Sequence, residues 1–305
     1  MTVRIVDGGL STALEEAGHR LDDPLWTARF LIDDPEAIVA AHLAFLRAGA
    51  RVLITSSYQA SETGFVAAGL APQEAVAALR STTALAVEAR IRFTLEDPAG
   101  AADVLVAASV GPYGATLYDG SEYRAPAVDE DTLVDFHRAR LHVLVDTQPD
   151  LLAIETLAST QEARAIGRAL EGLPSVPAWM SFTCRDGATT WGGEPIEELV
   201  AAAAAVPSVI AVGVNCTAPN YVTPLLEHIG RVTNLPLVAY PNGGQSWDAH
   251  GKVWVGAGSG FSKEEIALWV TLGARYIGGC CGVGASGVVA LRDAVDQTGG
   301  TLAAG

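Results

Sequence analysis

Residues 151–171, LLAIETLASTQEARAIGRALE, contain the pattern that decides the fold. The first four residues are apolar and are followed by the carboxylate of Glu155, as expected of a strand that is buried on both faces of a sheet. Residues 160–171 then repeat apolar side chains at the spacing of one helix face. This segment therefore predicts a βα unit of a parallel sheet, with an acidic residue at the carboxyl end of its strand.

The same unit recurs along the chain of 305 residues. The predicted strands are residues 3–6, 51–55, 103–108, 151–155, 178–183, 209–215, 237–240 and 275–278. The predicted helices are residues 35–48, 72–90, 129–147, 160–171, 195–205, 219–232, 262–272 and 286–295. This alternation predicts one α/β domain over residues 1–305, a (βα)8 TIM barrel, with a doubly wound open sheet as the alternative.

Composition and charge exclude several classes of protein. A formal net charge of -16 argues against the basic face that binds a nucleic-acid backbone. The N-terminus has no basic stretch followed by an apolar run, and no segment offers about 18 uninterrupted apolar residues for a bilayer. We therefore expect a soluble cytoplasmic protein without a nucleic-acid or membrane partner, and the sequence carries no signal for an oligomeric state.

All four cysteines follow predicted strands, and three of them come after the sixth and eighth strands. Cys216 ends the run VGVNC, and Cys280 with Cys281 lies in the run IGGCCG. Because chemistry in this fold gathers at the carboxyl ends of the strands, the three thiols are expected on one rim of the barrel. Adjacent residues of a strand point to opposite faces, so this pair reaches one ion only where the chain has left the strand conformation. The flanking glycines supply that freedom: Gly278, Gly279 and Gly282.

Three thiolates suit Zn²⁺ and leave its fourth tetrahedral position for water or substrate. We therefore expect one zinc ion per chain, bound by Cys216, Cys280 and Cys281. A vicinal disulfide and buried structural cysteines remain open as alternatives without metal. Cys184 also follows a predicted strand and is expected to be a spare thiol. A non-enzymatic barrel would require a structural zinc closed by a fourth ligand such as His250 or Cys184.

A glycine-rich segment, VWVGAGSG at residues 253–260, precedes a predicted helix and imitates a nucleotide-binding turn. Such a site usually has an acidic residue about 20 positions later for the ribose. Residues 275–282 contain none. The sequence therefore disfavours a dinucleotide-binding protein.

Six motifs spread over nearly the whole sequence resemble one family, the homocysteine S-methyltransferases. They are DGG at residues 7–9, ITSSYQAS at 54–61, ET at 155–156, GVNC at 213–216, YPN at 240–242 and GGCCG at 278–282. The resemblance implies a (βα)8 barrel that binds L-homocysteine, with zinc on Cys216, Cys280 and Cys281. Cobalamin-dependent methionine synthases need further domains for which a chain filled by one barrel has no room.

Within this family the chain is more similar to enzymes that use a sulfonium donor, S-methylmethionine or S-adenosylmethionine, because SSYQAS lacks the aromatic-rich version of the betaine enzymes. The implied reaction is methyl transfer to the thiolate of L-homocysteine, which forms methionine and serves methionine biosynthesis. Betaine or another donor, and a selenol acceptor, remain open. Coordination to zinc deprotonates a thiol, so the substrate thiolate is the expected nucleophile and no protein nucleophile is needed.

The resemblance also implies a set of substrate contacts. The expected residues are Asp7, Gly8, Gly9, Thr55, Glu155 and Asn215. The two carboxylates would accept hydrogen bonds from the ammonium of homocysteine, and the N–H groups of the two glycines would meet its carboxylate. Other roles remain open: a helix cap or turn for Asp7, an internal ion pair for Glu155, and a turn or the support of the metal loop for Asn215.

Three aromatic residues, Trp26, Tyr58 and Tyr113, are candidates for contact with the donor. Aromatic ring faces attract methylated cations at short range, so they suit a sulfonium group. An ordinary buried position in the core remains equally open for each ring.

Overall fold

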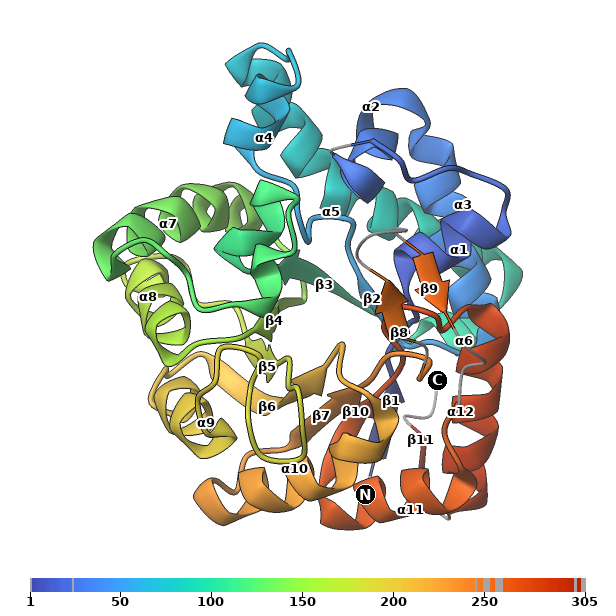
Figure 1. Cartoon of the computed structure of the whole chain (residues 1–305). Coiled ribbons are helices and arrows are strands. Elements are labelled where there is room, and N and C mark those ends of the chain that lie inside the picture. The colour runs from blue at the N-terminus through green and yellow to red at the C-terminus, as the bar shows by residue number, and fades with distance from the viewer. Residues whose placement is uncertain are drawn as a thin grey trace.

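Parallel strands form a barrel with helices around its outside (Figure 1). The computed structural model describes residues 2–23, 25–244, 246–248, 253–255, 260–298 and 301–302. Helices on the outside cover the apolar outer face of the strands, which is why these strands read as nearly continuous apolar runs. The predicted (βα)8 barrel is confirmed, and the doubly wound open sheet is wrong.

The strands of the barrel are β1 (Thr2–Ile5), β2 (Val52–Ile54), β3 (Leu105–Val110), β4 (Leu151–Leu157), β5 (Ala178–Phe182), β6 (Val209–Asn215), β7 (Leu237–Tyr240) and β10 (Ala274–Ile277). They pair in the order β1-β10-β7-β6-β5-β4-β3-β2, and β11 (Thr301–Leu302) adds to β1. A parallel bridge between Val6 and Val52 joins β1 to β2. The N–H of Asp7 donates to the carbonyl of Val52 at 3.0 Å, so hydrogen bonds close the barrel at this seam.

The outer helices are α3 (Pro35–Ala48), α5 (Pro72–Glu96), α7 (Glu130–Asp146), α8 (Thr160–Leu170), α9 (Ile196–Ala204), α10 (Pro219–Val232), α11 (Lys263–Leu272) and α12 (Ala285–Gln297). Local signals fix several ends: Ser262 and Glu265 form the expected capping box of α11. Gly49 and Gly273 end α3 and α11 in the left-handed conformation, at φ values of 113° and 111°. Among the described helices, none is both long and apolar enough to cross a bilayer.

Short elements that the sequence pattern did not predict lie in the connections. They are α1 (Leu10–Glu16), η1 (Trp26–Arg29), α2 (Phe30–Asp33), α4 (Glu62–Ala67), α6 (Pro98–Ala101), η2 (Tyr113–Leu117), η3 (Ser121–Tyr123), β8 (Ser246–Asp248) and β9 (Val253–Val255). Elements of one or two turns give too few repeats for a periodic pattern. Two of them, η2 and η3, follow β3 and bring residues to the carboxyl rim of the barrel.

Most predicted boundaries agree with the structure to within one or two residues, and those of β6, β7, α3 and α10 coincide with it. The largest difference is α5, which ends at Glu96 rather than at residue 90. The nucleotide-like turn falls mainly on residues 256–259, which lie outside the described residues, as does His250. Residues 253–255 form β9, which pairs antiparallel with β8.

One apolar layer fills the interior of the barrel, and a second lies between the strands and the helices. The interior layer contains Val6, Val52, Ala107, Leu151, Ala153, Trp179, Ala211, Val238 and Tyr240. The alternate residues, such as Leu152 and Ile154 of β4, belong to the larger cluster between the strands and the helices. Because side chains alternate along a strand, the residue two places beyond Ala153, which is Glu155, continues the interior face toward the carboxyl rim.

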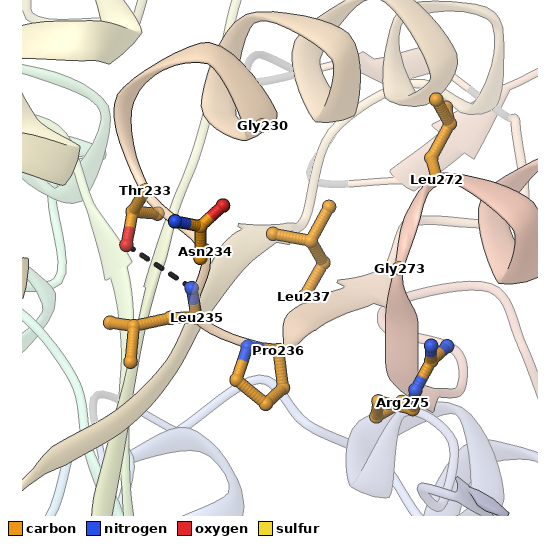
Figure 2. A pocket seen from close by; sticks show the side chains of 9 residues that line it. All are labelled: Gly230, Thr233, Asn234, Leu235, Pro236, Leu237, Leu272, Gly273 and Arg275. Atoms are coloured by element: carbon orange, nitrogen blue, oxygen red, sulfur yellow. Dashed lines mark hydrogen bonds between the residues drawn. The ribbon is translucent and has the colours of Figure 1, made fainter. Parts of the chain in front are cut away.

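A shallow hollow lies at the other end of the barrel (Figure 2). It has a volume of about 280 Å³ and is lined by Gly230, Thr233, Asn234, Leu235, Pro236, Leu237, Leu272, Gly273 and Arg275. Leu237 begins β7, and Arg275 lies at the start of β10. The hollow therefore opens at the amino ends of the strands, away from the rim where this fold places its chemistry.

One buried histidine makes the stability of the fold depend on pH. His42 of α3 is fully buried, and neither ring nitrogen has a hydrogen-bond partner within the described part of the chain. Burial lowers its pKa to about 4. As the pH falls below the ordinary histidine pKa of about 6.5, His42 binds a proton in the unfolded chain but stays neutral in the folded chain. The contribution of His42 to the free energy of unfolding is thus greatest above pH 6.5 and decreases as the pH falls toward 4.

We predict that His42→Leu removes this loss, because an apolar side chain fills the site without a proton to exclude. Between pH 7 and pH 5 the wild type should lose about 2 kcal/mol more unfolding free energy than the variant. Urea denaturation at both pH values measures the difference. His142→Leu, at an exposed position of α7, is the control. Equal losses in the wild type and His42→Leu would contradict the assignment.

Candidate metal and substrate site

Three cysteines converge at the carboxyl rim. Their Sγ atoms all lie within 4.8 Å of one another. Cys216 directly follows β6, and Cys280 and Cys281 follow β10. Strand β7 lies between these two strands, so the loops that carry the thiols are near neighbours on the rim. The structure thus brings together the three sulfurs that the sequence predicted to meet.

The backbone around these cysteines has left the strand conformation. Strand β10 ends at Ile277, and Cys216 itself has a φ of 47°. Among the three flanking glycines, Gly282 has a φ of 76°, whereas Gly278 and Gly279 have no positive φ. A Cβ on Gly279 would lie 2.2 Å from Cγ1 of Val283. The expected backbone freedom therefore belongs to Gly282, and the two preceding glycines serve close packing.

The donor set fits a thiolate-bound metal ion. Sulfurs that lie about 2.3 Å from a tetrahedral ion are about 3.8 Å apart, which agrees with the spread of this cluster. All four cysteines are free thiols, so a vicinal disulfide is absent. In the described residues the cluster contains no histidine or carboxylate as a fourth ligand. Cys184 lies outside the cluster, and burial raises the pKa of its thiol, as suits a spare cysteine.

A tyrosine that the sequence pattern missed also contacts this cluster. The hydroxyl of Tyr123 lies 3.4 Å from Sγ of Cys216. Its ring meets the half-exposed ring of Trp191 edge to face at 6.0 Å. Tyr123 belongs to η3, a single turn in the connection between β3 and α7, where no periodic pattern marks it. Only the path of that connection over the rim could have identified it.

Glu155 lies on the interior face of β4 and is buried. The hydroxyl of Ser109 donates to Oε1, and the hydroxyl of Tyr240 donates to Oε2 at 3.1 Å. Burial raises the pKa of this carboxyl to about 7, although both hydroxyls oppose the shift. No arginine, lysine or histidine of the described chain forms a salt bridge with it, which removes the internal ion pair as its explanation.

Asp7 follows β1 and is 2% exposed. Its Oδ2 accepts a hydrogen bond from the N–H of Ile54 at 2.8 Å, while Oδ1 has no partner within the described part of the chain. Burial raises the pKa of Asp7 well above its usual value, and the nearby Glu155 adds to the shift. The N-cap of α1 is Gly9, so Asp7 caps no helix and its alternative role there is wrong.

Both the oxygen and the nitrogen of the Asn215 side-chain amide make hydrogen bonds. Its Oδ1 accepts from the N–H of Thr156 at 2.8 Å and from the hydroxyl of Ser181 at 2.8 Å. Its Nδ2 donates to Oγ1 of Thr156 at 2.7 Å. Thr156 has a φ of 62°, which is unusual for a β-branched residue. Asn215 therefore holds the backbone next to Glu155.

Comparison with known proteins identifies the family. A family model described as homocysteine S-methyltransferase matches residues 4–295. The chain belongs to this family. A homocysteine S-methyltransferase of Escherichia coli (strain K12) is 41% identical over 95% of this chain and 94% of its own length. A selenocysteine Se-methyltransferase of Brassica oleracea var. italica is 40% identical over 91% of this chain and 84% of its own.

A solved structure agrees with this assignment. The metallated form of the homocysteine methyltransferase MmuM from Escherichia coli superposes with a TM-score of 0.86. The two sequences are 40% identical, and the match covers 96% of each chain. The prediction of a homocysteine S-methyltransferase is thereby confirmed. A non-enzymatic barrel with a structural zinc is no longer needed to explain the cysteines.

The remaining predicted substrate contacts of the methyltransferase are Thr55, Gly8 and Gly9. Oγ1 of Thr55 accepts from the N–H of Ser109 at 3.1 Å and lies 2.7 Å from the hydroxyl of Ser57. Because Ser109 in turn holds Glu155, Thr55 supports the carboxylate from behind. The N–H of Gly9 donates to Val283 at 3.0 Å, so it is not available for a substrate carboxylate. Of the two expected amides, only that of Gly8 lacks a partner among the described residues.

The three aromatic candidates of the methyltransferase separate into two groups. Trp26 and Tyr58 lie edge to face with their ring centroids 6.4 Å apart. Burial raises the pKa of Tyr58, and the charge of Cys216 adds to the shift, which places this ring near the cluster. Tyr113 instead packs on Phe136 of α7 at 5.1 Å, within a peripheral apolar cluster. We therefore withdraw Tyr113 as a donor contact, because α7 holds its ring outside the barrel.

We predict that the purified methyltransferase holds about one thiolate-bound metal ion per chain. Cys216→Ser and Cys281→Ser should each reduce the bound metal to a small fraction, since two thiols and a hydroxyl are a much weaker donor set. Elemental analysis of dialysed protein measures the content, and circular dichroism reports on folding. Cys184→Ala is the control and should keep its full metal content. Retention of metal by folded Cys216→Ser would refute the assignment.

Proposed function

We propose that this enzyme transfers a methyl group from a sulfonium donor, S-methylmethionine or S-adenosylmethionine, to the thiolate of L-homocysteine and forms methionine. One observation carries the proposal: three free thiols lie within 4.8 Å of one another at the carboxyl rim of a barrel of this family. Methionine biosynthesis is the corresponding role. Residues 1–305 would act as one homocysteine-binding barrel domain.

We propose Zn²⁺ as the metal, held by Cys216, Cys280 and Cys281, one ion per chain. Soft thiolate ligands favour zinc over magnesium, calcium or manganese, and three protein ligands are typical of zinc sites that keep a position for substrate. When bound there, zinc would lower the pKa of the homocysteine thiol and so supply a thiolate at neutral pH. Such a site needs reduced cysteines, which supports a cytoplasmic location.

Asp7 and Glu155 are proposed to bind the ammonium of homocysteine. Both carboxyls are buried, and both have raised pKa values because burial disfavours their charged forms. An ammonium placed beside them would lower both pKa values and occupy the unpaired Oδ1 of Asp7. The N–H of Gly8 remains as a donor for the substrate carboxylate. Thr55 and Asn215 keep Ser109 and Thr156 in place around Glu155.

The transfer itself would depend on alignment rather than on acid-base catalysis. The thiolate attacks the methyl carbon of the donor, a C–S bond forms as the donor C–S bond breaks, and the electron pair stays on the departing sulfur. Opposite charges cancel and no proton moves, so no general acid or base is required. The proposed contribution of the protein is to place two sulfurs in line with one carbon. The rings of Trp26 and Tyr58 are proposed to line the path of the cation.

A selenol acceptor is the second candidate. The selenocysteine Se-methyltransferase of Brassica oleracea var. italica shares 40% identity with this chain. A selenol carries the same charge and geometry as a thiol and would meet the same cysteine cluster. Competition between L-homocysteine and L-selenocysteine in one assay separates the two activities by their ratio of kcat/KM.

We predict that Glu155→Gln weakens homocysteine binding far more than it weakens the fold. The amide keeps the shape of the side chain but loses the charge that binds an ammonium. At pH 8, above the Glu155 pKa of about 7, the KM for homocysteine should rise at least about tenfold. The unfolding free energy should change by less than about 1 kcal/mol, because the charge of this buried carboxylate is itself costly.

Glu162→Gln is the matched control for this change. Glu162 is a second buried glutamate, and it bonds the ring of His137 at 2.9 Å and the N–H of Tyr113 at 2.5 Å. Its amide variant should lose stability while the KM for homocysteine stays unchanged. Equal losses of stability and binding in Glu155→Gln would favour a purely structural role for Glu155.

We predict that parallel assays will show methionine formation from S-methylmethionine or S-adenosylmethionine with a kcat/KM at least about tenfold above that with betaine. The only aromatic residue of the segment SSYQAS is Tyr58. Mass spectrometry of methionine from a labelled methyl group measures each donor. Chelation should abolish transfer, and added zinc should restore it. Preference for betaine would overturn the donor, and full activity after complete chelation would overturn the metal.

A further inference from the structure

A second carboxylate at the rim has one oxygen without a hydrogen-bond partner among the described residues. Glu122 lies in the middle of η3, between Ser121 and Tyr123. Its Oε2 is buried and has no hydrogen-bond partner within the part of the chain that the structure describes. The mechanism above does not use this residue. A buried carboxylate oxygen without a partner is costly to the free protein, so a group that binds there would relieve a real penalty.

The surroundings of Glu122 are aromatic and acidic. The next residue, Tyr123, contacts Sγ of Cys216 at 3.4 Å. Burial raises the pKa of Tyr58, and the charge of Glu122 adds to the shift. Burial raises the pKa of Glu122, and the charge of Asp119 on the same connection adds to the shift. Within the described residues no cation compensates it.

This arrangement fits a cation that also carries N–H groups. A sulfonium is positively charged but has no N–H, so it can lie against aromatic rings without satisfying a carboxylate oxygen. An ammonium can satisfy it with a charge-assisted hydrogen bond. S-methylmethionine and S-adenosylmethionine carry both groups, whereas betaine carries a quaternary nitrogen without N–H. Glu122 can therefore distinguish these donors by chemistry.

We propose that Glu122 binds the α-ammonium of the methyl donor and selects amino-acid sulfonium compounds over donors that lack an ammonium. This inference rests on the proposed function. The proposed site for the ammonium of homocysteine is a separate one, formed by Asp7 and Glu155. Burial raises the pKa of Asp7 and the charge of Glu155 adds to the shift, while Oδ1 of Asp7 has no hydrogen-bond partner within the described residues. The reaction brings two amino acids to one cysteine cluster, and the structure offers an unpaired carboxylate oxygen for each ammonium.

The experiment compares two donors in the wild type and in Glu122→Gln. S-methylmethionine has the ammonium, and dimethylsulfoniopropionate has the same dimethylsulfonium and carboxylate without it. In the variant, the KM for S-methylmethionine should rise at least about tenfold, while the KM for homocysteine and the metal content stay within about twofold. Binding of dimethylsulfoniopropionate, measured as inhibition of the S-methylmethionine reaction, should stay unchanged. Glu122→Asp should recover part of the donor binding.

Asp119→Asn is the matched control. Asp119 is exposed on the same connection, and its Oδ1 accepts from the N–H of Ser121, which asparagine can also do. This variant removes one nearby negative charge without touching Oε2 of Glu122, so its KM for S-methylmethionine should stay close to that of the wild type. An equal effect in both variants would mean that general charge, and not a contact, determines donor binding, and would overturn the proposal.

Other outcomes are equally decisive. An unchanged KM for S-methylmethionine in active Glu122→Gln overturns the donor role and leaves the proposed function standing. A rise in the KM for homocysteine alone assigns Glu122 to the other substrate and also overturns it. A metal-loaded wild type that forms no methionine from any sulfonium donor overturns the proposed function and this inference together.

Discussion

Backbone hydrogen bonds between the loops at the carboxyl rim hold the three cysteines together. The N–H of Cys280 donates to Pro241 at 2.8 Å, and the carbonyl of Cys281 accepts from Gly243 at 2.8 Å. The loop after β7 is therefore fastened to the loop after β10, and the N–H of Cys216 reaches Tyr240 at 3.3 Å. These bonds bring thiols from distant parts of the chain to one place on the rim, which is the preorganisation that a reactive metal site requires.

Near the cysteine cluster, the barrel shields carboxyl groups from water. Continuation of the interior face of β4 places Glu155 above an apolar layer, and its pKa of about 7 reflects that burial. Asp7 and Glu122 each leave a carboxylate oxygen unpaired within the described chain. Such groups destabilise the free protein, and a bound ammonium relieves the cost. In the proposed function, these carboxylates would exchange some stability of the fold for affinity toward amino-acid cations.

Strained backbone is also found at the carboxyl rim. Thr156 and Cys216 are held at positive φ, where side chains with a Cβ are disfavoured, and both lie at the rim. The amide of Asn215 bonds both the backbone and the side chain of Thr156, which holds the strained turn in place. The pairing of β4 with β5 also shifts register between Ile154 and Leu157. The irregularity therefore coincides with Glu155 and Thr156 in the last part of β4.

The sequence alone determined the repeating units, the barrel and the residues that end its strands, because periodicity and strand ends are local properties. It placed three cysteines and two acidic residues on one rim for that reason. Only the tertiary structure decided that the ring of Tyr113 packs on α7, that the N–H of Gly9 is used by Val283, and that η3 brings Glu122 to the rim. Hydrogen-bond partners and side-chain directions depend on atoms from remote segments, and a loop without periodicity carries no local record of where it lies.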